Sequence, residues 1–67
     1  MIIILNDIDK KFLRDNNFRI DYDKDYGDDE FLKLLDDLYF QEISYVGIDE
    51  TKAKRYADIA DKIAELD

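Results

Sequence analysis

DYDKDYGDDEFLKLLDD, residues 21–37, holds the turn and the helix start from which the fold can be worked out. Gly27 predicts a turn. Asp28 or Asp29 can cap the helix that follows, because a carboxylate accepts hydrogen bonds from free backbone N–H groups at a helix start. Beyond the turn, apolar residues recur at the spacing of a helix with one buried face. They are Phe31, Leu34, Leu35, Leu38 and Tyr39, with Leu32 beside them. We therefore predict a helix over about residues 28–42.

Two apolar patterns precede this turn. Residues 2–5 read IIIL, a short run rich in β-branched side chains that is typical of a strand buried on both faces. Apolar and polar residues alternate over residues 18–23, as in a strand with one buried face. Between them, Asn6 is a suitable N-cap for a helix over residues 7–15. The first third of the chain thus predicts strand, helix and strand.

The last third of the chain predicts another helix. Residues 43–46 read ISYV, which indicates a brief third strand or a connector. Gly47 then interrupts the chain, and Asp49 is a candidate N-cap. Over residues 50–66, apolar and small side chains recur on one face and charged side chains on the other, as expected for an amphipathic helix.

These patterns combine into one α+β domain spanning residues 1–67. It would contain two or three short strands and helices near residues 7–15, 28–42 and 50–66. A chain of 67 residues supports a single small core. An all-α helical bundle is the alternative, if the apolar run at the start proves helical.

The composition limits the partners that the chain can bind. Eighteen acidic residues oppose ten basic ones, so the net charge is -8. Direct binding to nucleic acid needs a basic surface, and anionic membranes would repel this chain as well. A basic protein surface, such as that of a nucleic-acid-binding protein or nuclease, is the partner that this charge favours. The alternative is that the charge only keeps a small protein in solution.

Residues that commonly perform catalysis or bind zinc are missing. The chain has no Cys and no His, which excludes disulfides and the usual zinc sites and removes the commonest general base. Ser44 is the only serine, and Gly27 and Gly47 are the only glycines, so no glycine-rich phosphate loop exists. We expect no enzymatic activity and no cofactor. The residues near Met1 lack the pattern of a signal peptide, and no run is long enough to span a membrane, so we expect a cytoplasmic protein.

A possible calcium site lies at the acidic end of the second predicted strand. The spacing of Asp21, Asp23 and Asp25 resembles the start of an EF-hand loop. That loop requires Gly directly after the third acid, where this chain has Tyr26, and Glu at its twelfth position, where this chain has Leu32. We therefore expect no metal site, and these three carboxylates remain metal candidates by spacing alone.

The acidic stretch is instead the predicted partner-binding surface. Duplex DNA carries a negative charge about every 1.7 Å of its axis, and a rigid row of carboxylates could compete for a groove that holds phosphates. Aromatic residues among the acids would serve as anchors. The predicted partner-binding residues are Asp21, Tyr22, Asp23, Asp25, Tyr26, Asp28, Asp29, Glu30, Asp36 and Asp37. The plain alternative is a solvated acidic face with ordinary core tyrosines.

In size, acidity and lack of catalytic residues, the chain is similar in type to small inhibitors that phages and mobile elements encode against host nucleases and CRISPR effectors. This similarity implies a non-enzymatic inhibitor that imitates nucleic acid. The alternative is a small regulatory or antitoxin-like protein that acts through a hydrophobic interface, with a partner or as its own dimer. A helix-turn-helix regulator is disfavoured, because Asp58, Asp61 and Glu65 follow the basic residues on the last helix.

Overall fold

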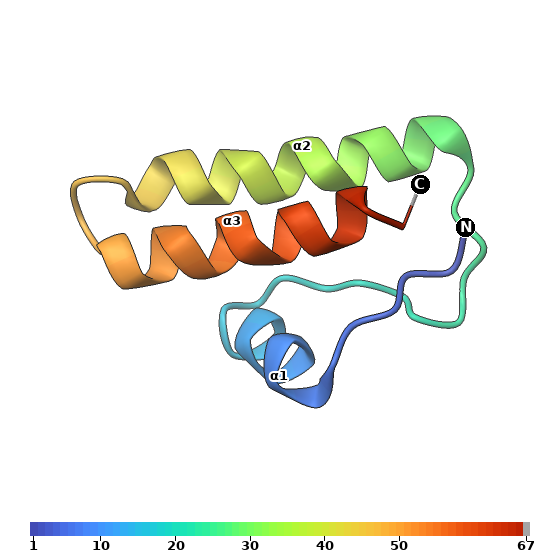
Figure 1. The fold of residues 1–67 in the computed structure, drawn as a ribbon, viewed down its shortest axis with the longest axis horizontal. Helices are drawn as coiled ribbons and strands as arrows, with labels where there is room; N and C mark the ends of the chain where they lie inside the picture. Colours follow the sequence, from blue (N-terminus) through green and yellow to red (C-terminus); the bar gives the residue numbers. More distant parts are fainter. Residues whose placement is uncertain (67) are drawn as a thin grey trace.

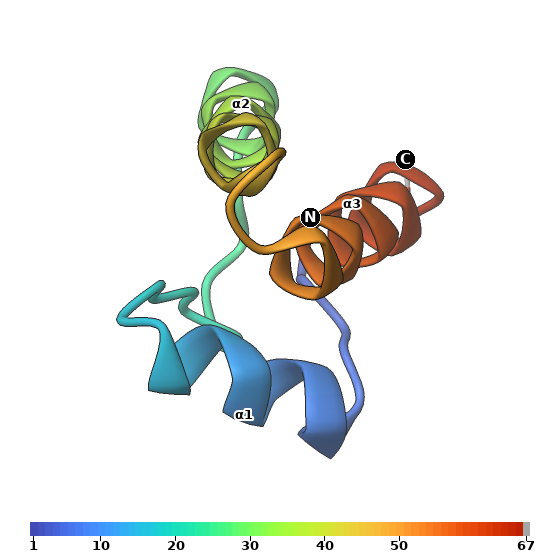
Figure 2. The same cartoon turned by 90° about the vertical axis from the view of Figure 1, so that its left-hand side faces the viewer.

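The computed structural model describes residues 1–66, which form three helices. The helices are α1 (Asp7–Asp15), α2 (Asp28–Tyr45) and α3 (Glu50–Ala64). α2 and α3 lie side by side and run in opposite directions, joined by a short turn (Figure 1). α1 lies crosswise on the other side of α3, and an extended segment leads from it back to the start of α2 (Figure 2).

The helix starts follow from local side-chain chemistry. The Asn6 side chain accepts a hydrogen bond of 2.8 Å from the Asp9 N–H, and Asp49 accepts one of 3.1 Å from the Lys52 N–H. Both predicted N-caps are confirmed. The N-cap of α2 is Gly27, not Asp28 or Asp29 as predicted. Asp28 and Asp29 lie in the first turn of the helix, where the helix dipole also favours acids.

Two residues with positive φ redirect the chain after helices. Asn17 has φ 59° just beyond α1, and Gly47 has φ 82° just beyond α2. Asn tolerates this left-handed conformation better than most residues, and Gly adopts it without steric cost. These two positions allow each helix to end sharply, so that the following segment can fold back onto the protein.

The core lies where the three helices meet, and Tyr56 of α3 is at its centre. Its ring contacts Phe12 edge-on with centroids 5.1 Å apart, and stacks on Tyr45 at 5.9 Å. Such aromatic pairs stabilise a core beyond the area that they bury. The buried apolar residues are Ile3, Leu5, Leu13, Phe31, Leu34, Leu38, Ala53, Tyr56, Ile59, Ala60 and Ile63.

The predicted α+β class is wrong, because the described chain is all-helical and contains no sheet. Within residues 1–66, β pairing is limited to one isolated antiparallel bridge, between Ile2 and Asp25. The run at residues 2–5 is neither a strand nor a helix, and it buries only alternate side chains. Ile3 and Leu5 are buried, whereas Ile4 is 69% exposed.

Residues 18–23 also form no strand, although apolar and polar side chains alternate along them. Phe18, Ile20 and Tyr22 are half-buried between exposed Arg19 and Asp21, so the pattern correctly marks which side chains face inward. A strand additionally needs a partner backbone over several residues. A turn at residues 22–24 bends this segment, so it meets the N-terminal segment only near Met1, whose carbonyl accepts a 2.7 Å hydrogen bond from the Tyr26 N–H.

The possible third strand at residues 43–46 is wrong as well, because α2 continues to Tyr45. The Ser44 hydroxyl donates a 2.8 Å hydrogen bond to the Phe40 carbonyl one turn earlier, which is compatible with a helix. Among the described residues, no helix has both the length and the apolar character needed to cross a membrane.

Candidate protein-interaction surface

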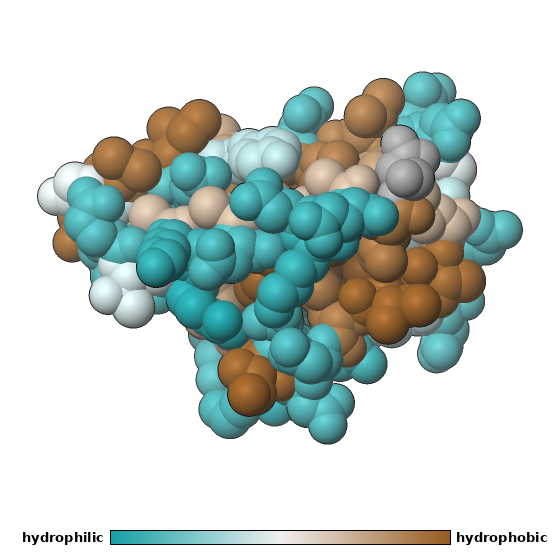
Figure 3. Space-filling view, viewed as in Figure 1, coloured by the Kyte–Doolittle hydropathy of each residue, from teal (hydrophilic) through white to brown (hydrophobic). Residues whose placement is uncertain are grey.

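Large apolar side chains are exposed along the outer side of α2 and the turn after it. Phe40 is 66% exposed, Ile43 70% and Ile48 80%, whereas Leu38 on the inner side of the same helix is fully buried. We call this surface the α2 apolar face; it comprises Leu32, Tyr39, Phe40, Ile43, Val46 and Ile48. Figure 3 shows apolar side chains over α2 at the upper edge of the molecule.

The geometry of a helix explains why these residues form one surface. Residues three and four apart are neighbours on a helix, so Leu32, Tyr39 and Ile43 fall on one stripe with Phe40 beside it. This stripe is turned away from Phe31 and Leu38, which pack against α3 in the core. α2 is therefore apolar on two sides, and the described chain covers only one of them.

Exposed acids frame the α2 apolar face. Asp36 lies one turn after Leu32 and one turn before Phe40, so it adjoins both side chains. Asp28 and Asp29 extend the acidic character to the N-terminal end of the helix, whereas Asp37 is turned to another side of α2, where it lines a depression with Glu30 and Lys33. Within residues 1–66, none of these four carboxylates takes part in an ion pair. The surface thus combines an apolar centre with unneutralised acids.

Except for Glu30 in the first turn of α2, the other predicted partner-binding residues lie in the loop before α2, and some of them are hydrogen-bonded to one another. A carboxylate oxygen of Asp21 accepts a 3.0 Å hydrogen bond from the Asp23 N–H, and the Tyr26 hydroxyl accepts one of 3.1 Å from the Asp21 N–H. Tyr22 lies under the Lys10 ammonium group at 4.6 Å. These contacts shape the loop rather than leaving free anchors.

Two of the predicted acids are neutralised within the protein. The Asp25 carboxylate lies against the Met1 amino group, and the Glu30 carboxylate pairs with Lys24. The hydrogen bond from Lys24 lowers the pKa of Glu30, and a further bond from the Gly27 N–H acts in the same direction. The predicted row of ten residues therefore separates into an internally bonded loop and the free acids of α2.

The three candidate metal ligands do not converge on one point. Asp21 is engaged in its own turn, and Asp25 faces the amino terminus. In the part of the chain that the structure describes, no group of three acidic residues has the geometry to hold a metal ion. The carboxylates with EF-hand spacing are therefore dispersed around a turn.

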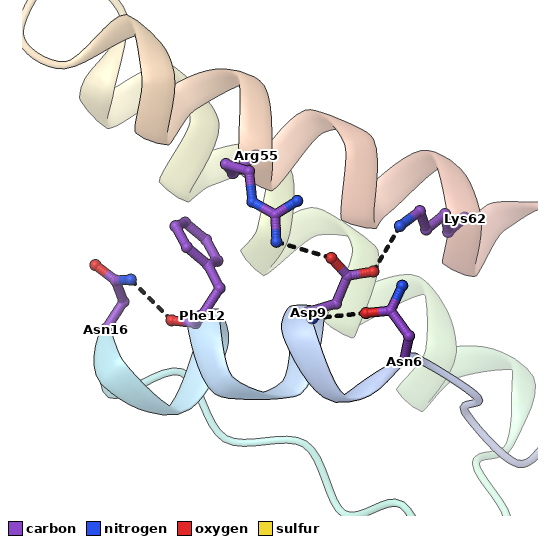
Figure 4. Close-up of polar contacts among 6 residues, drawn as sticks. All are labelled: Asn6, Asp9, Phe12, Asn16, Arg55 and Lys62. Carbon is purple, nitrogen blue, oxygen red and sulfur yellow. Dashed lines mark hydrogen bonds and ion pairs between the residues drawn. The ribbon is translucent and has the colours of Figure 1, made fainter.

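The most deeply buried charged group is one that sequence reasoning missed. Asp9 is 1% exposed, and its two carboxylate oxygens accept hydrogen bonds from Arg55 at 2.9 Å and from Lys62 at 2.6 Å (Figure 4). The sequence predicts Asp9 only as part of the helix over residues 7–15. No local pattern announces its partners, because they lie on α3. The guanidinium group of Arg55 is thereby held on the inner side of α3, near the Phe12 ring.

Sequence reasoning also missed the exposure of the α2 apolar face. One signal was present in the sequence. Besides the apolar residues of the predicted buried stripe, α2 carries Phe40 and Ile43, and Val46 follows directly after it, which is more than one core-facing stripe requires. The prediction of a strand at residues 43–46 concealed this signal by assigning those residues to a sheet.

No protein-family model, curated protein or solved structure matches this chain.

Proposed function

We propose that this chain is a non-enzymatic binding protein that inhibits a basic, nucleic-acid-binding protein, such as a nuclease, in the cytoplasm. The observation that supports the proposal most is the outer side of α2, where exposed apolar residues adjoin Asp36 and, toward the start of the helix, Asp28 and Asp29, which have no ion-pair partners within residues 1–66. Protein interfaces commonly have this composition, with an apolar centre and a polar rim.

The apolar centre would supply most of the affinity. Aromatic and large aliphatic side chains at the middle of an interface contribute most of its binding energy, and Tyr39, Phe40 and Ile43 form such a group. An isolated exposed apolar residue is ordinary on a protein surface, but several large apolar side chains exposed on the same side of a helix are typical of an interaction site.

The acids would select the partner. Asp28, Asp29, Asp36 and Asp37 favour a surface rimmed by Lys and Arg, the kind that nucleic-acid-binding proteins present to phosphates. Occupation of that surface would exclude the nucleic acid. A second copy of this chain would bring another charge of -8 to the interface, which opposes self-association.

The experiment measures binding to a panel of purified nucleases and CRISPR effectors by calorimetry, at several salt concentrations and in competition with duplex DNA. We expect a one-to-one complex with one member, weakened by salt and displaced by DNA. Phe40→Ser with Ile43→Ser should weaken it by about a hundredfold, as expected for interface-centre residues. Ile8→Ser, at an equally exposed isoleucine on α1, is the matched control.

The acidic contribution has its own variant. Asp28→Asn, Asp29→Asn, Asp36→Asn and Asp37→Asn in combination should weaken binding and flatten its salt dependence. The control Asp58→Asn with Asp61→Asn removes exposed acids from α3. Unchanged binding by the fourfold α2 variant would exclude imitation of nucleic acid.

A second candidate function is a regulatory protein that acts as its own dimer through the same apolar face. The exposure of Phe40, Ile43 and Ile48 favours it as well, because an antiparallel pair of α2 helices would cover all three. Analytical ultracentrifugation at low and high salt distinguishes the two: a dimer that salt strengthens and Phe40→Ser abolishes would support this candidate over the first.

A further inference from the structure

A depression with a basic lining lies between α1 and the segment that follows it, away from the α2 apolar face. It has a volume of about 450 Å³. Lys10 and Arg14 line it from α1, and Arg19 lines it from the segment beyond, while Phe18, Ile20 and Tyr22 supply apolar walls. No acidic side chain is part of this lining. Figure 2 shows the two chain segments that form it lying close together.

The backbone brings these residues together through a single turn. Asn17 adopts φ 59°, and the Phe18 N–H donates a 2.8 Å hydrogen bond to the Leu13 carbonyl. The chain therefore reverses at the end of α1 and runs back beside it, which places Arg19 near the helix that carries Arg14. The depression is thus formed by the fold of residues 10–22, which are close in sequence.

The three cations of the depression are free to bind a ligand. Within residues 1–66, neither Lys10 nor Arg14 nor Arg19 belongs to an ion pair. Two acids adjacent in sequence are paired elsewhere: Asp9, next to Lys10, with Arg55 and Lys62, and Asp15, next to Arg14, with Lys11 at 2.8 Å. Lys10 is held over the Tyr22 ring at 4.6 Å, which fixes its ammonium group beside an aromatic surface.

A local concentration of positive charge is unexpected in this chain. The net charge is -8, and yet three of its ten basic residues line one depression without an acid among them. Lys11 and Lys24, in contrast, are paired with acids, and Arg19 also borders a second depression that Glu30 and Asp37 line.

We propose that this depression binds a phosphate monoester carried on a planar aromatic body, the chemistry of a nucleoside monophosphate. A phosphate monoester carries up to two negative charges and three acceptor oxygens, which three cations can match, whereas a carboxylate offers one charge and two oxygens. Guanidinium groups bind phosphate oxygens in pairs, and Arg14 and Arg19 supply two such groups.

The apolar walls fit the rest of the ligand. Tyr22 and Phe18 are half-buried, and the parts of their rings that Lys10 and Tyr56 leave uncovered offer aromatic surface to a base. The volume is within the range of sites that enclose small molecules, roughly 300–1,000 Å³. The site is independent of the α2 apolar face, so a ligand here and a protein partner there would not compete for residues.

The experiment titrates the ¹⁵N-labelled chain with adenosine 5′-monophosphate, inorganic phosphate or adenosine, at constant ionic strength, and follows amide chemical shifts. We expect saturable shifts confined to residues 10–22 with adenosine 5′-monophosphate. Phosphate alone should bind about tenfold more weakly, because it lacks the stacking contribution of the base. Equal affinity for phosphate alone would assign the site to free phosphate and overturn the nucleotide proposal.

Matched charge variants complete the test. Arg14→Gln with Arg19→Gln should weaken binding by at least about tenfold, since two charge-assisted hydrogen-bonding groups are lost. Lys33→Gln with Lys54→Gln changes the net charge by the same amount outside the depression, and should leave the affinity within about twofold. Absence of saturable shifts with every probe, or equal weakening by both double variants, would overturn the proposal. Amide spectra of the variants verify that the fold is retained.

Discussion

Lys62 Nζ donates a hydrogen bond of 2.6 Å to Asp9 Oδ2, although 53 positions separate the two residues in the chain. Arg55 Nη2 donates one of 2.9 Å to the other carboxylate oxygen. Asp9 therefore joins α1 to two points on α3 that are two turns apart. A carboxylate that is 1% exposed would be costly without such partners.

Loss of the buried carboxylate should destabilise the protein. We expect Asp9→Ala to lower the free energy of unfolding by about 2–3 kcal/mol, because two charge-assisted hydrogen bonds are lost and α1 is released from α3. Urea denaturation followed by circular dichroism measures the change. Asp15→Ala, which breaks only the exposed pair with Lys11, is the control and should change stability little. Equal effects of the two substitutions would contradict a structural role for Asp9.

The two sides of α2 should respond differently to truncation. Leu38→Ala should cost about 2–5 kcal/mol of stability, since the fully buried side chain leaves a cavity in the core. Phe40→Ala, two residues further on, should change stability by less than about 0.5 kcal/mol, because its side chain is already 66% exposed. Thermal and urea unfolding of the two variants measure this contrast. A large destabilisation by Phe40→Ala would show that the α2 apolar face is covered within the free protein.

The two glycines should differ in their tolerance of a side chain. Gly47 has φ 82°, so Gly47→Ala should cost about 1–2 kcal/mol through backbone strain, even though no atom lies within 4 Å of the added Cβ. Gly27 has φ -74°, which any residue adopts, and its added Cβ would make an ordinary 3.6 Å contact with Glu30. Gly27→Ser should stabilise α2 by a few tenths of a kcal/mol by adding a capping hydroxyl.

Thermal melts of the two glycine variants measure these effects. Gly47→Asn provides a further check, because Asn tolerates positive φ better than Ala and should recover part of the loss. A Gly47→Ala protein as stable as the original would contradict the conformation of this turn.

Stability should fall at alkaline pH because of Tyr56. Burial raises the pKa of the Tyr56 phenol above its ordinary value of 10.0, and the neighbouring Tyr45 acts in the same direction. The unfolded chain therefore releases this proton at a lower pH than the folded protein does. The contribution of Tyr56 is complete below pH 10.0 and is lost as the pH rises through the higher pKa of the folded state.

Urea denaturation at pH values from 8 to 11 tests this linkage, with phenolate absorbance as a second measurement. Tyr56→Phe should remove part of the alkaline loss of stability, and Tyr39→Phe, at an exposed tyrosine of α2, is the control. If stability falls equally steeply with pH in the original protein, Tyr56→Phe and Tyr39→Phe, the loss comes from general charge repulsion and not from Tyr56.

The helices could be predicted largely from the sequence because their signals are local. Asn6 and Asp49 each supply a side-chain acceptor within three residues of the N–H that they cap, and the apolar spacing from Phe31 to Leu38 is a property of one segment. The strand predictions were wrong because strand pairing does not depend on local signals alone. Alternation at residues 18–23 reports burial, but whether a partner backbone lies alongside is decided by the rest of the fold.

The candidate surface could be predicted only in part. Asp28, Asp29, Asp36 and Asp37 were among the predicted residues, and they do lie exposed on one helix. The apolar residues beside them, such as Phe40 and Ile43, were not predicted as a surface. Their exposure depends on which side of α2 packs against α3, and an apolar residue does not reveal by itself whether another helix covers it.

By itself, the sequence of this protein determined where α1, α2 and α3 begin, the excess of acidic charge, and the absence of cysteine and histidine chemistry. These depend on residue identity and on contacts within one turn of helix. Only the tertiary structure decided that residues 2–5 stay extended without a sheet, that Asp9 is buried between Arg55 and Lys62, and that one side of α2 stays uncovered. Those outcomes depend on contacts between residues far apart in the chain, which local sequence patterns do not contain.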